Sequence, residues 1–502
     1  MMKGQIKVGV VTFSHAPEYD STTEREEYVR SEHDTLCTFL SENGFDVVAP
    51  LREYRKGQVY PRYGISTVRD LEYCIDSLKN SKVDCVIIHL SQWIRVALAV
   101  TLLKEMDLPS ALYADSDDRW AGEVTASAVA ASVFESASSP NLLLLERFRT
   151  SEKDDVLYWL KGAGTLQAMK KGRMVAWGGT YGADIPWTRD DEAILENTFI
   201  KEILHEQEIV LIEGARKILR DDPGRINNFI TWLRANNVKI RFDNQMLTED
   251  ALKFQIGQYF TAKDRLRELQ DEHIVGVSIK CHFEVSTNCI GCTECLIPGF
   301  LPFGEDCEGP KDIVPVACEG DLKGLLSLVM LHMIKPDIPP LFGDMIYFKK
   351  TNMLMSNCGA SSVYWAGRSN DINVSLPRVG LLPQVHGKSG STVHYITPAG
   401  EVTLARLFRV KGQYLMYLGV GRVSDDPSEV KMREGAPWPQ TYAVFDSDPY
   451  LLYKTSPCNH GCVTEGDVTK EVEAFCRHAG VRVIRCDDNL SLENYRKDLA
   501  HF

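Results

Sequence analysis

Two carboxylates flank the most apolar segment of the chain. Residues 322–334 (LKGLLSLVMLHMI) are apolar on nearly every face, which predicts a buried helix. Glu319 precedes this segment and Asp344 follows it, and each stands next to a glycine. Because burying a charge is costly unless a cation compensates for it, this placement predicts a divalent metal ion beside the helix.

A histidine near the C-terminus completes a set of metal ligands. His460 lies in the segment CNHGC, which has neither helical nor strand periodicity and therefore predicts a loop. Carboxylate oxygens together with an imidazole nitrogen suit a hard divalent cation. Glu319, Asp344 and His460 are therefore the candidate metal ligands.

The motifs around these three residues resemble a known enzyme family. ACEGD around Glu319, FGDM around Asp344 and NHG around His460 are similar, in type, order and spacing, to the signatures of the L-fucose isomerases and their L-arabinose isomerase relatives. The resemblance implies a metal-dependent intramolecular oxidoreductase that interconverts an aldose and its ketose through an enediol. It also implies that Glu319 and Asp344 are metal ligands and acid/base groups, that His460 completes the site, and that the ion is Mn²⁺ or another divalent cation.

The chemistry of such an isomerase needs an acid and a base beside the cation. The proton on the carbon next to a carbonyl is too weakly acidic for an unaided carboxylate, so a cation on the sugar oxygens must stabilise the developing charge. Glu319 and Asp344 would divide the proton transfers, and His460 would bind the ion through its neutral imidazole. The residues leave open which carboxylate takes the carbon proton and whether a hydride shift replaces proton transfer.

The pattern of apolar runs predicts an α/β fold with three parts. Residues 1–172 alternate short apolar runs with helical segments, which predicts a Rossmann-like domain with a parallel sheet covered by helices. Residues 173–345 repeat this pattern in a second α/β domain that carries the carboxylates, although residues 190–219 read as one long helix. Residues 346–502 change to short strands and carry the histidine, and the family resemblance favours a β-barrel over a sandwich. These strands are expected at residues 372–376, 392–397, 402–410 and 414–420.

No nucleotide-binding signature accompanies these sheets. The first strand is followed by SHAPEYD rather than GxGxxG, GVGRVS at Gly419 lacks the third glycine, and no Walker A sequence occurs. A glycine-rich turn, GGTYGADIPW, does follow the strand at residues 174–177, where open α/β sheets place ligand contacts. Tyr181 and Asp184 on this turn are candidate substrate contacts, and a tight turn with packing aromatics is the alternative.

Four further side chains are candidate sugar contacts. Asn357 and His386 lie in predicted polar loops of the last domain, and Trp93 and Trp438 could stack on a sugar face. Each has an ordinary alternative, because asparagine builds turns, a loop histidine is usually solvated and a tryptophan beside prolines usually packs.

A cysteine cluster supports a different function. Cys289, Cys292 and Cys295 have the CxxCxxC spacing of iron–sulfur or zinc ligation, but position 299 is glycine where the ferredoxin pattern has a fourth cysteine. Further thiols nearby are Cys281, Cys307 and Cys318. The alternatives are a thiol-rich turn near the active site and a Cys-ligated metal or sugar-binding protein without isomerase activity.

Composition limits the partners of this protein. The 502 residues carry a net charge of −13 without a basic run, which argues against nucleic acid as a partner. The apolar runs are too short for a bilayer span and the N-terminal segment lacks a cleavage site, so we expect a cytoplasmic protein without membrane contact. The family resemblance implies a sugar substrate and a trimer-based homo-oligomer, possibly a hexamer, in which the first domain of one subunit completes the site of another.

The family resemblance leaves two kinds of sugar open. L-fucose, D-arabinose and L-arabinose are neutral, whereas some relatives act on sulfoquinovose, a glucose with a sulfonate at carbon six. A methyl group at the far end of the sugar needs apolar walls, whereas a sulfonate needs fixed cations. The C-terminal third of this chain is shorter than in the long bacterial relatives, so residues there transfer poorly. The neutral sugar is the first expectation and sulfoquinovose the alternative, for which the candidate cations are Arg95, Arg119, Lys388 and Arg433.

Overall fold

The protein divides into two compact units. The structure is a computed structural model, which describes residues 6–116, 121–289, 291–349, 352–424 and 436–501. Unit 1 comprises Met169–Thr469 and Val481–Phe502 together with Met1, and unit 2 comprises Met2–Ala168 and Lys470–Gly480. The division into three domains at residues 172 and 345 stays a prediction.

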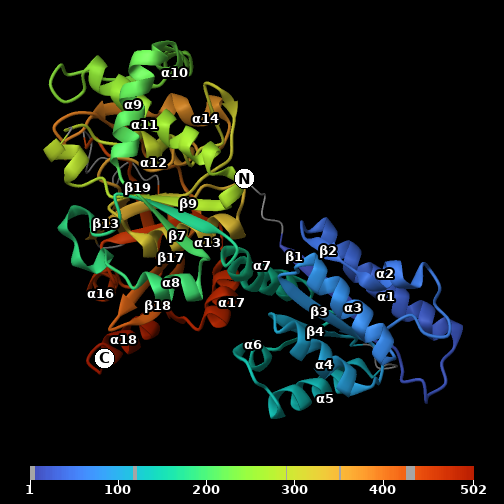
Figure 1. The fold of residues 1–502 in the computed structure, drawn as a ribbon. Helices are drawn as coiled ribbons and strands as arrows, with labels where there is room; N and C mark the ends of the chain where they lie inside the picture. Colours follow the sequence, from blue (N-terminus) through green and yellow to red (C-terminus); the bar gives the residue numbers. More distant parts are fainter. Residues whose placement is uncertain (1–5, 117–120, 290, 350–351, 425–435, 502) are drawn as a thin grey trace. The chain divides into compact units, whose positions relative to one another are not determined.

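Unit 2 is a parallel five-stranded sheet between helices (Figure 1). Its strand order, β2-β1-β3-β4-β5, is that of flavodoxin-like doubly wound sheets. Every pair of neighbours is parallel, which confirms the predicted sheet. The strands are β1 (Lys7–Thr12), β2 (Asp46–Val48), β3 (Cys85–Leu90), β4 (Ser110–Ala114) and β5 (Glu146–Arg149).

Alternate residues of the strands in unit 2 face two different helical layers. Val8 and Val10 of β1 pack with helices α1 and α7, whereas Val11 packs with α3, α4 and α5 on the other face. Because both faces are covered, the central strands β1, β3 and β4 are buried at nearly every position, whereas the edge strand β5 is mostly charged. The helices are α1 (Thr23–Glu42), α2 (Pro50–Arg55), α3 (Val68–Ser81), α4 (Val96–Met106), α5 (Gly122–Glu135), α6 (Pro140–Leu143), α7 (Lys153–Met169) and most of α17 (Thr469–Ala479).

Unit 1 contains a second parallel sheet. Its order is β12-β9-β6-β7, formed by β6 (Arg173–Trp177), β7 (Glu202–Glu206), β9 (Ile274–Ile279) and β12 (Val316–Ala317). The helices of this part are α8 (Glu192–Thr198), α9 (Ile209–Asp221), α10 (Pro223–Ala235), α11 (Glu249–Glu268), α12 (Leu296–Phe300) and α13 (Leu322–Ile334). None of the helices in the described ranges combines the length and apolarity that crossing a membrane requires.

The prediction of one long helix at residues 190–219 was wrong. This segment forms α8, then strand β7, then α9. β7 reads EILHE and pairs with β6 alone, at the edge of the sheet. An edge strand with charged, partly exposed side chains lacks the apolar signal of its neighbours, which is why the pattern hid it.

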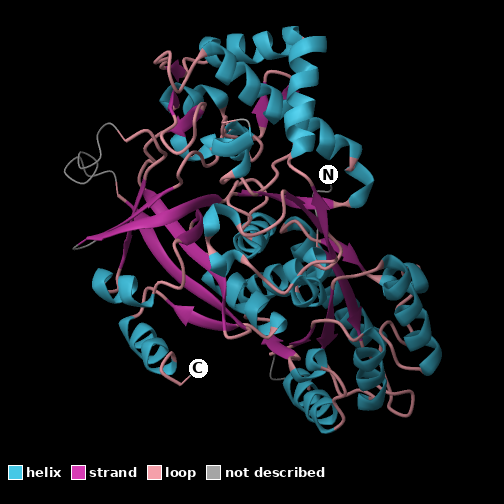
Figure 2. Cartoon of the chain, turned by 60° about the vertical axis from the view of Figure 1, so that its left-hand side comes forward, coloured by secondary structure: helices cyan, strands magenta, loops and turns pink. Residues whose placement is uncertain are grey.

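Six antiparallel strands of unit 1 close into a barrel, as predicted. The order is β17-β20-β13-β14-β19-β18, and β18 returns to pair with β17. Figure 2 shows these strands as long twisted arrows in magenta. They are β13 (Leu341–Lys349), β14 (Asn352–Ser356), β17 (Gly400–Val410), β18 (Gln413–Val423), β19 (Thr441–Phe445) and β20 (His460–Glu465), and β21 (Arg482–Arg485) extends β18 in parallel.

Two segments that were predicted as barrel strands are not part of the barrel. Residues 372–376 begin with a helical turn, α14 (Ile372–Ser375), because Asp371 caps it by accepting a hydrogen bond from the backbone nitrogen of Asn373. The strand expected at residues 392–397 is β16 (Ser391–His394), which joins β15 (Gly380–Pro383) and β8 (Lys239–Ile240) in a separate small sheet. The other elements are β10 (Glu305–Asp306), β11 (Gly309–Pro310), α16 (Pro449–Thr455) and α18 (Asn489–Asp498).

Helix α13 connects the second parallel sheet to the barrel. It has the bounds predicted from the sequence, and eleven of its thirteen residues are buried. It contacts β9 and β12 of the sheet and β13, β17 and β20 of the barrel. The apolar helix is therefore covered on all sides, and its N-terminal end lies where the strands of both sheets carry the candidate ligands.

Candidate active site

Glu319 stands on a tight turn between β12 and α13. Glu319 and Gly320 both have positive φ, 59° and 66°. A Cβ on Gly320 would lie 2.9 Å from the Cα of Thr180, so this position requires glycine. Asp321 then caps α13, because its Oδ1 accepts a hydrogen bond of 2.9 Å from the backbone nitrogen of Gly324. The ACEGD motif thus presents Glu319 at the carboxyl end of a parallel strand.

The glycine-rich loop after β6 packs directly on this turn. The backbone nitrogen of Gly182 donates to the carbonyl oxygen of Glu319 at 3.1 Å. On the same loop, the hydroxyl of Tyr181 donates to Asp184 at 2.8 Å, and the guanidinium of Arg189 lies 3.9 Å from the centre of the Tyr181 ring. The structure therefore pairs Tyr181 and Asp184 with each other beside Glu319, and their contact with a substrate stays a prediction.

Asp344 and His460 face each other on neighbouring barrel strands. They are partners in the antiparallel register of β13 and β20. His460 is the first residue of β20, so the prediction that it lies in a loop was wrong. Its strand begins with polar residues at the site and becomes apolar only further on, which removes the alternation that would reveal a strand.

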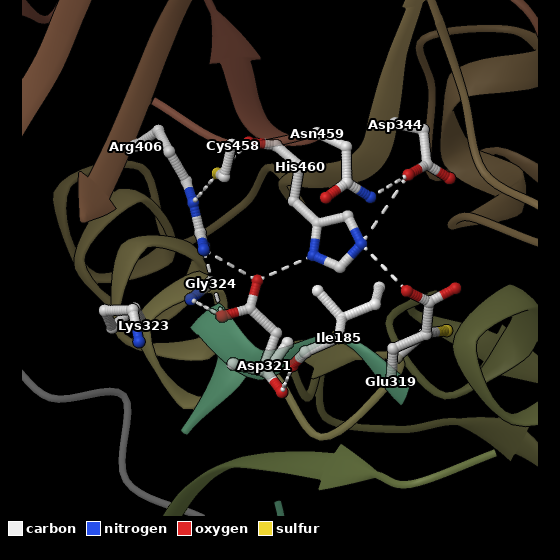
Figure 3. A network of polar contacts seen from close by, with 12 residues as sticks. Ile185, Glu319, Asp321, Lys323, Gly324, Asp344, Arg406, Cys458, Asn459 and His460 are labelled. Carbon is white, nitrogen blue, oxygen red and sulfur yellow. Dashed lines mark hydrogen bonds and ion pairs between the residues drawn. The ribbon is translucent and has the colours of Figure 1, made fainter. Parts of the chain in front are cut away.

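Two of the predicted ligands, Glu319 and Asp344, converge on one nitrogen of the third, His460 (Figure 3). Nε2 of His460 lies 3.0 Å from Oε2 of Glu319 and 3.6 Å from Oδ1 of Asp344. The imidazole is buried, and so is the Glu319 side chain, while Asp344 is partly exposed. A convergence of two carboxylates and an imidazole is the donor set that suits a hard divalent cation.

A buried ion pair behind His460 fixes the orientation of its ring. Nδ1 of His460 lies 2.8 Å from Oδ2 of Asp321, and the same carboxylate oxygen lies 2.8 Å from the guanidinium of Arg406. Figure 3 shows Asp321 between Arg406 and His460. A carboxylate on one imidazole nitrogen holds the ring so that the other nitrogen faces a metal ion, which is the arrangement found around histidine ligands in metalloenzymes. The residues therefore fit a divalent cation held by Glu319, Asp344 and His460.

A second chain of contacts orients Asp344. The indole nitrogen of Trp187 donates to the amide oxygen of Asn459 at 3.2 Å, and the amide nitrogen of Asn459 donates to Asp344 at 2.7 Å. The Trp187 ring also packs edge-on against His460, with ring centres 5.0 Å apart. Lys323 holds the backbone of this loop by donating to the carbonyl oxygen of Trp187 at 3.0 Å.

The charges in this site move the pKa values apart. Burial would raise the pKa of Glu319, but the hydrogen bond from His460 and the charge of that ring lower it. Burial raises the pKa of Asp344 to about 6. Burial would lower the pKa of His460, but its hydrogen bonds with Asp321 and Glu319 raise it well above its usual value. In the absence of a cation, a proton on His460 balances the negative charge of the carboxylates.

The remaining candidates in unit 1 lie in two places. Asn357 is buried after β14, where its amide nitrogen donates to the Ala360 carbonyl and to the sulfur of Cys318, so it builds the turn. His386 and Trp438 stack on each other with ring centres 5.0 Å apart and an angle of 7°. His386 also lies edge-on to His282 at 6.5 Å. His282 in turn approaches the sulfur of Cys358, which contacts Glu319, so a chain of contacts links the stacked pair to the carboxylate of Glu319.

The candidate anion-binding residues are distributed over both units. Lys388 is exposed on the same loop as His386 in unit 1. Arg95 pairs with Glu18 in unit 2, and Trp93 is an exposed side chain of the same unit. Arg119 and Arg433 lie outside the residues that the structure describes.

The sequence analysis missed several residues that position the predicted ligands. Asp321 lies in the same motif as Glu319, and its place three residues before Gly324 is an N-cap pattern that could have drawn attention to it. Arg406 is fully buried, and an arginine within an apolar strand indicates a buried partner. Asn459 and Trp187 gave no comparable signal, because they meet only in the folded chain.

Comparisons with known proteins agree with the family resemblance. Residues 355–486 match the family model described as L-fucose isomerase, C-terminal domain. A sulfoquinovose isomerase from Alkalicoccus urumqiensis is 24% identical over 254 residues, which cover 49% of this chain and 52% of that protein. The chain thus spans about half the length of the curated relative it matches.

Proposed function

We propose, from the premise that the chain is an L-fucose isomerase-family protein, that it interconverts an aldose and its ketose with the help of a divalent cation. One observation carries the proposal. Two carboxylates, Glu319 and Asp344, converge on the nitrogen of His460 that faces away from the buried Asp321. The cation that we propose is Mn²⁺, with these three residues as its ligands.

The residues of the site divide the chemistry between them. When bound, the cation would stabilise the negative charge that develops on the sugar oxygens as the carbon proton leaves. Glu319, with its lowered pKa, is ionised and suited to accept the carbon proton. Asp344, with its raised pKa, is the better donor of a proton to oxygen. Asp321 keeps the Nδ1 proton of His460 in place, so that Nε2 remains a ligand.

The relative moves our choice of substrate toward sulfoquinovose. The sequence alone favoured a neutral sugar, but the similar protein is named a sulfoquinovose isomerase, which supports a sulfonated hexose. A sulfonate needs a fixed cation or N–H donors to replace its water. Lys388 is exposed on the loop that carries His386, and we propose it as the contact for the sulfonate. The stacked pair His386 and Trp438 would then form a wall for the sugar.

Initial rates on four sugars test this proposal. With Mn²⁺ present, sulfoquinovose should give the highest kcat/KM among sulfoquinovose, L-fucose, D-arabinose and L-arabinose. Lys388→Gln should raise the KM for sulfoquinovose and leave neutral sugars unaffected, whereas Lys217→Gln, at an exposed position of α9, should change neither. A preference for a neutral sugar would overturn the proposal that sulfoquinovose is the substrate. Failure to form a ketose from any of the four sugars would overturn the proposed isomerase activity.

We further propose that the protein is cytoplasmic and that it forms a trimer-based homo-oligomer, possibly a hexamer. The family resemblance supports an assembly in which unit 2 of one subunit completes the site of another. Trp93, an exposed tryptophan of unit 2, is the residue that we propose for this contact.

A further inference from the structure

A small cavity rich in thiols adjoins the catalytic carboxylate. Its lining includes Cys281, His282, Glu294, Cys295, Cys318 and Cys358. Its volume of about 20 Å³ holds a water molecule or an ion and is far too small for a sugar. The cavity itself therefore does not hold the substrate.

One wall of this cavity carries a carboxylate without a partner. Glu294 is 2% exposed, and neither of its carboxylate oxygens has a hydrogen-bond partner among the described residues. Buried carboxylates are normally hydrogen-bonded or paired with a cation, because desolvating them is costly. Burial raises the pKa of Glu294 to about 8, so this carboxyl group is mostly protonated at neutral pH and would ionise readily only beside a positive charge.

Three ligand atoms beside the cavity have the spacing of a tetrahedral metal site. The sulfur of Cys358 lies 3.6 Å from Oε1 of Glu319 and 3.7 Å from Nε2 of His282, and the three atoms lie within 4.8 Å of one another. Zinc at ordinary bond lengths to sulfur, nitrogen and oxygen separates neighbouring tetrahedral ligands by about 3.6 Å. Nδ1 of His282 lies 3.0 Å from the hydroxyl of Ser286, which holds the ring so that Nε2 faces Cys358.

The ligands come from segments far apart in the sequence. His282 follows β9, Glu319 follows β12 and Cys358 follows β14. The CxxCxxC run itself does not supply this set, because the thiol of Cys292 is directed at the carbonyl oxygen of Ala251, 3.7 Å away. The side chain of Cys289 lies outside what the structure describes. The linear spacing therefore indicated a thiol site but not its ligands.

We propose that Cys358, His282 and Glu319 bind a thiophilic divalent cation such as Zn²⁺, next to the position of the catalytic cation. Sulfur and nitrogen ligands select Zn²⁺ over Mn²⁺, which prefers oxygen. Glu319 bridges the two positions, because Oε2 faces His460 while Oε1 faces Cys358. Binding displaces the thiol proton of Cys358 into solvent, and the charge of the bound cation would favour ionisation of Glu294 on the cavity wall. The catalytic cation beside this site rests on the proposed function, whereas the Zn²⁺ site itself does not.

Cobalt substitution of the full chain tests this site without measuring activity. Metal-free protein titrated with Co²⁺ should develop a thiolate-to-cobalt charge-transfer band whose final intensity corresponds to one thiolate-bound cobalt ion per chain. Cys358→Ser should lose the band, whereas Cys307→Ser, at a thiol away from the cavity, should keep it. His460→Gln, which removes a ligand of the catalytic position alone, should keep it too. Absence of the band in the wild type, or its full retention in Cys358→Ser, would overturn the proposal.

A second variant guards against misfolding of Cys358→Ser. His282→Gln should weaken Zn²⁺ binding at least about tenfold in competition with a chelating dye, with the thermal transition of the protein measured alongside. An unchanged Zn²⁺ affinity in this folded variant contradicts the site. Failure of the proposed isomerase would appear as absence of ketose and would leave the cobalt band intact, so the two failures are distinguishable.

Discussion

Glu319 is shared between two sets of contacts, and both its backbone and its side chain are held in place. Its positive φ is maintained by the approach of the Gly182 backbone, and its two oxygens contact His460 and Cys358. A residue over-determined in this way does not need to reorganise during a reaction. Its replacement is therefore the most direct test at the scale of a single residue.

Glu319→Gln should reduce turnover by about 10²- to 10⁴-fold, because the amide neither accepts the carbon proton nor binds the cation as well. The side chain is similar in shape, so the fold should persist. Glu401→Gln, at an exposed position of β17, is the matched control and should retain the wild-type rate. More than about a tenth of the wild-type rate in Glu319→Gln would contradict the assignment.

Asp321→Asn should weaken Mn²⁺ binding about 10- to 100-fold, because the amide no longer holds the His460 ring as the carboxylate does. The measurement is the Mn²⁺ concentration that gives half of the maximal rate, together with kcat at saturating Mn²⁺. A positioning role predicts that much of kcat returns when Mn²⁺ is abundant. An unchanged Mn²⁺ requirement would show that Asp321 only caps α13.

At this scale the sequence indicated the candidate ligands but not the residues that position them. Glu319, Asp344 and His460 carry motifs that can be read locally, and the family match covers the motif of His460, while the role of all three as ligands stays a prediction. Arg406, by contrast, acts through an ion pair with Asp321, 85 positions away in the chain. Such contacts follow from tertiary packing, which no local pattern encodes.

The glycine-rich loop and the ACEGD turn form one structural element of the site. Their backbones touch at Gly182, where a Cβ would lie 2.3 Å from the carbonyl oxygen of Glu319. No flexible side chain is available to move away there, so one of the two backbones must shift. The position of Glu319 thus depends on a residue that performs no chemistry.

Gly182→Ala should lower both activity and stability. Overpacking of this kind costs about 1–3 kcal/mol, and the displacement of Glu319 should reduce kcat further. Gly224→Ala, in the first turn of α10 where the nearest atom to a new Cβ is 3.7 Å away, is the control. The readouts are the midpoint of thermal unfolding and kcat. Wild-type values for both in Gly182→Ala would disprove the close contact.

Elements with a strong apolar signal were predictable, and polar elements were not. Helix α13 has the predicted bounds because its apolar character is uniform. Strand β7 and the start of β20 were missed because their polar residues lie at a sheet edge and at the site. Pairing with a neighbouring strand holds these segments in place, and a single sequence does not display that pairing.

At the scale of the molecule, buried histidines should make stability depend on pH. Burial lowers the pKa of His33 to about 3 and that of His89 to about 4. The unfolded chain binds these protons near pH 6.5, whereas the folded chain does not. The free energy of unfolding is therefore highest above that pH, and it decreases as the pH falls toward 4. For His89 alone the loss amounts to about 3 kcal/mol.

Denaturant unfolding of the full chain at several pH values checks this expectation. The free energy of unfolding should fall between pH 6.5 and 4, and His89→Gln should flatten this fall even though its stability at pH 7 is lower. His501→Gln, at an exposed position near the C-terminus, is the control and should keep the wild-type slope. A slope unchanged by His89→Gln would contradict the prediction.

Assembly is the property that we expect to complete the site. Trp93 is 39% exposed, and the neighbouring Gln92 is buried with neither amide atom hydrogen-bonded among the described residues. A large exposed aromatic next in sequence to an unsatisfied buried amide marks a place that a second subunit could cover. Light scattering should therefore show a trimer or a multiple of it.

Trp93→Ala and Glu319→Gln should each be inactive alone. Mixed oligomers of the two variants should recover part of the wild-type rate, because some sites then combine an intact Glu319 with the Trp93 of another subunit. An active monomer, or no recovery in mixed oligomers, would show that each chain builds its site alone.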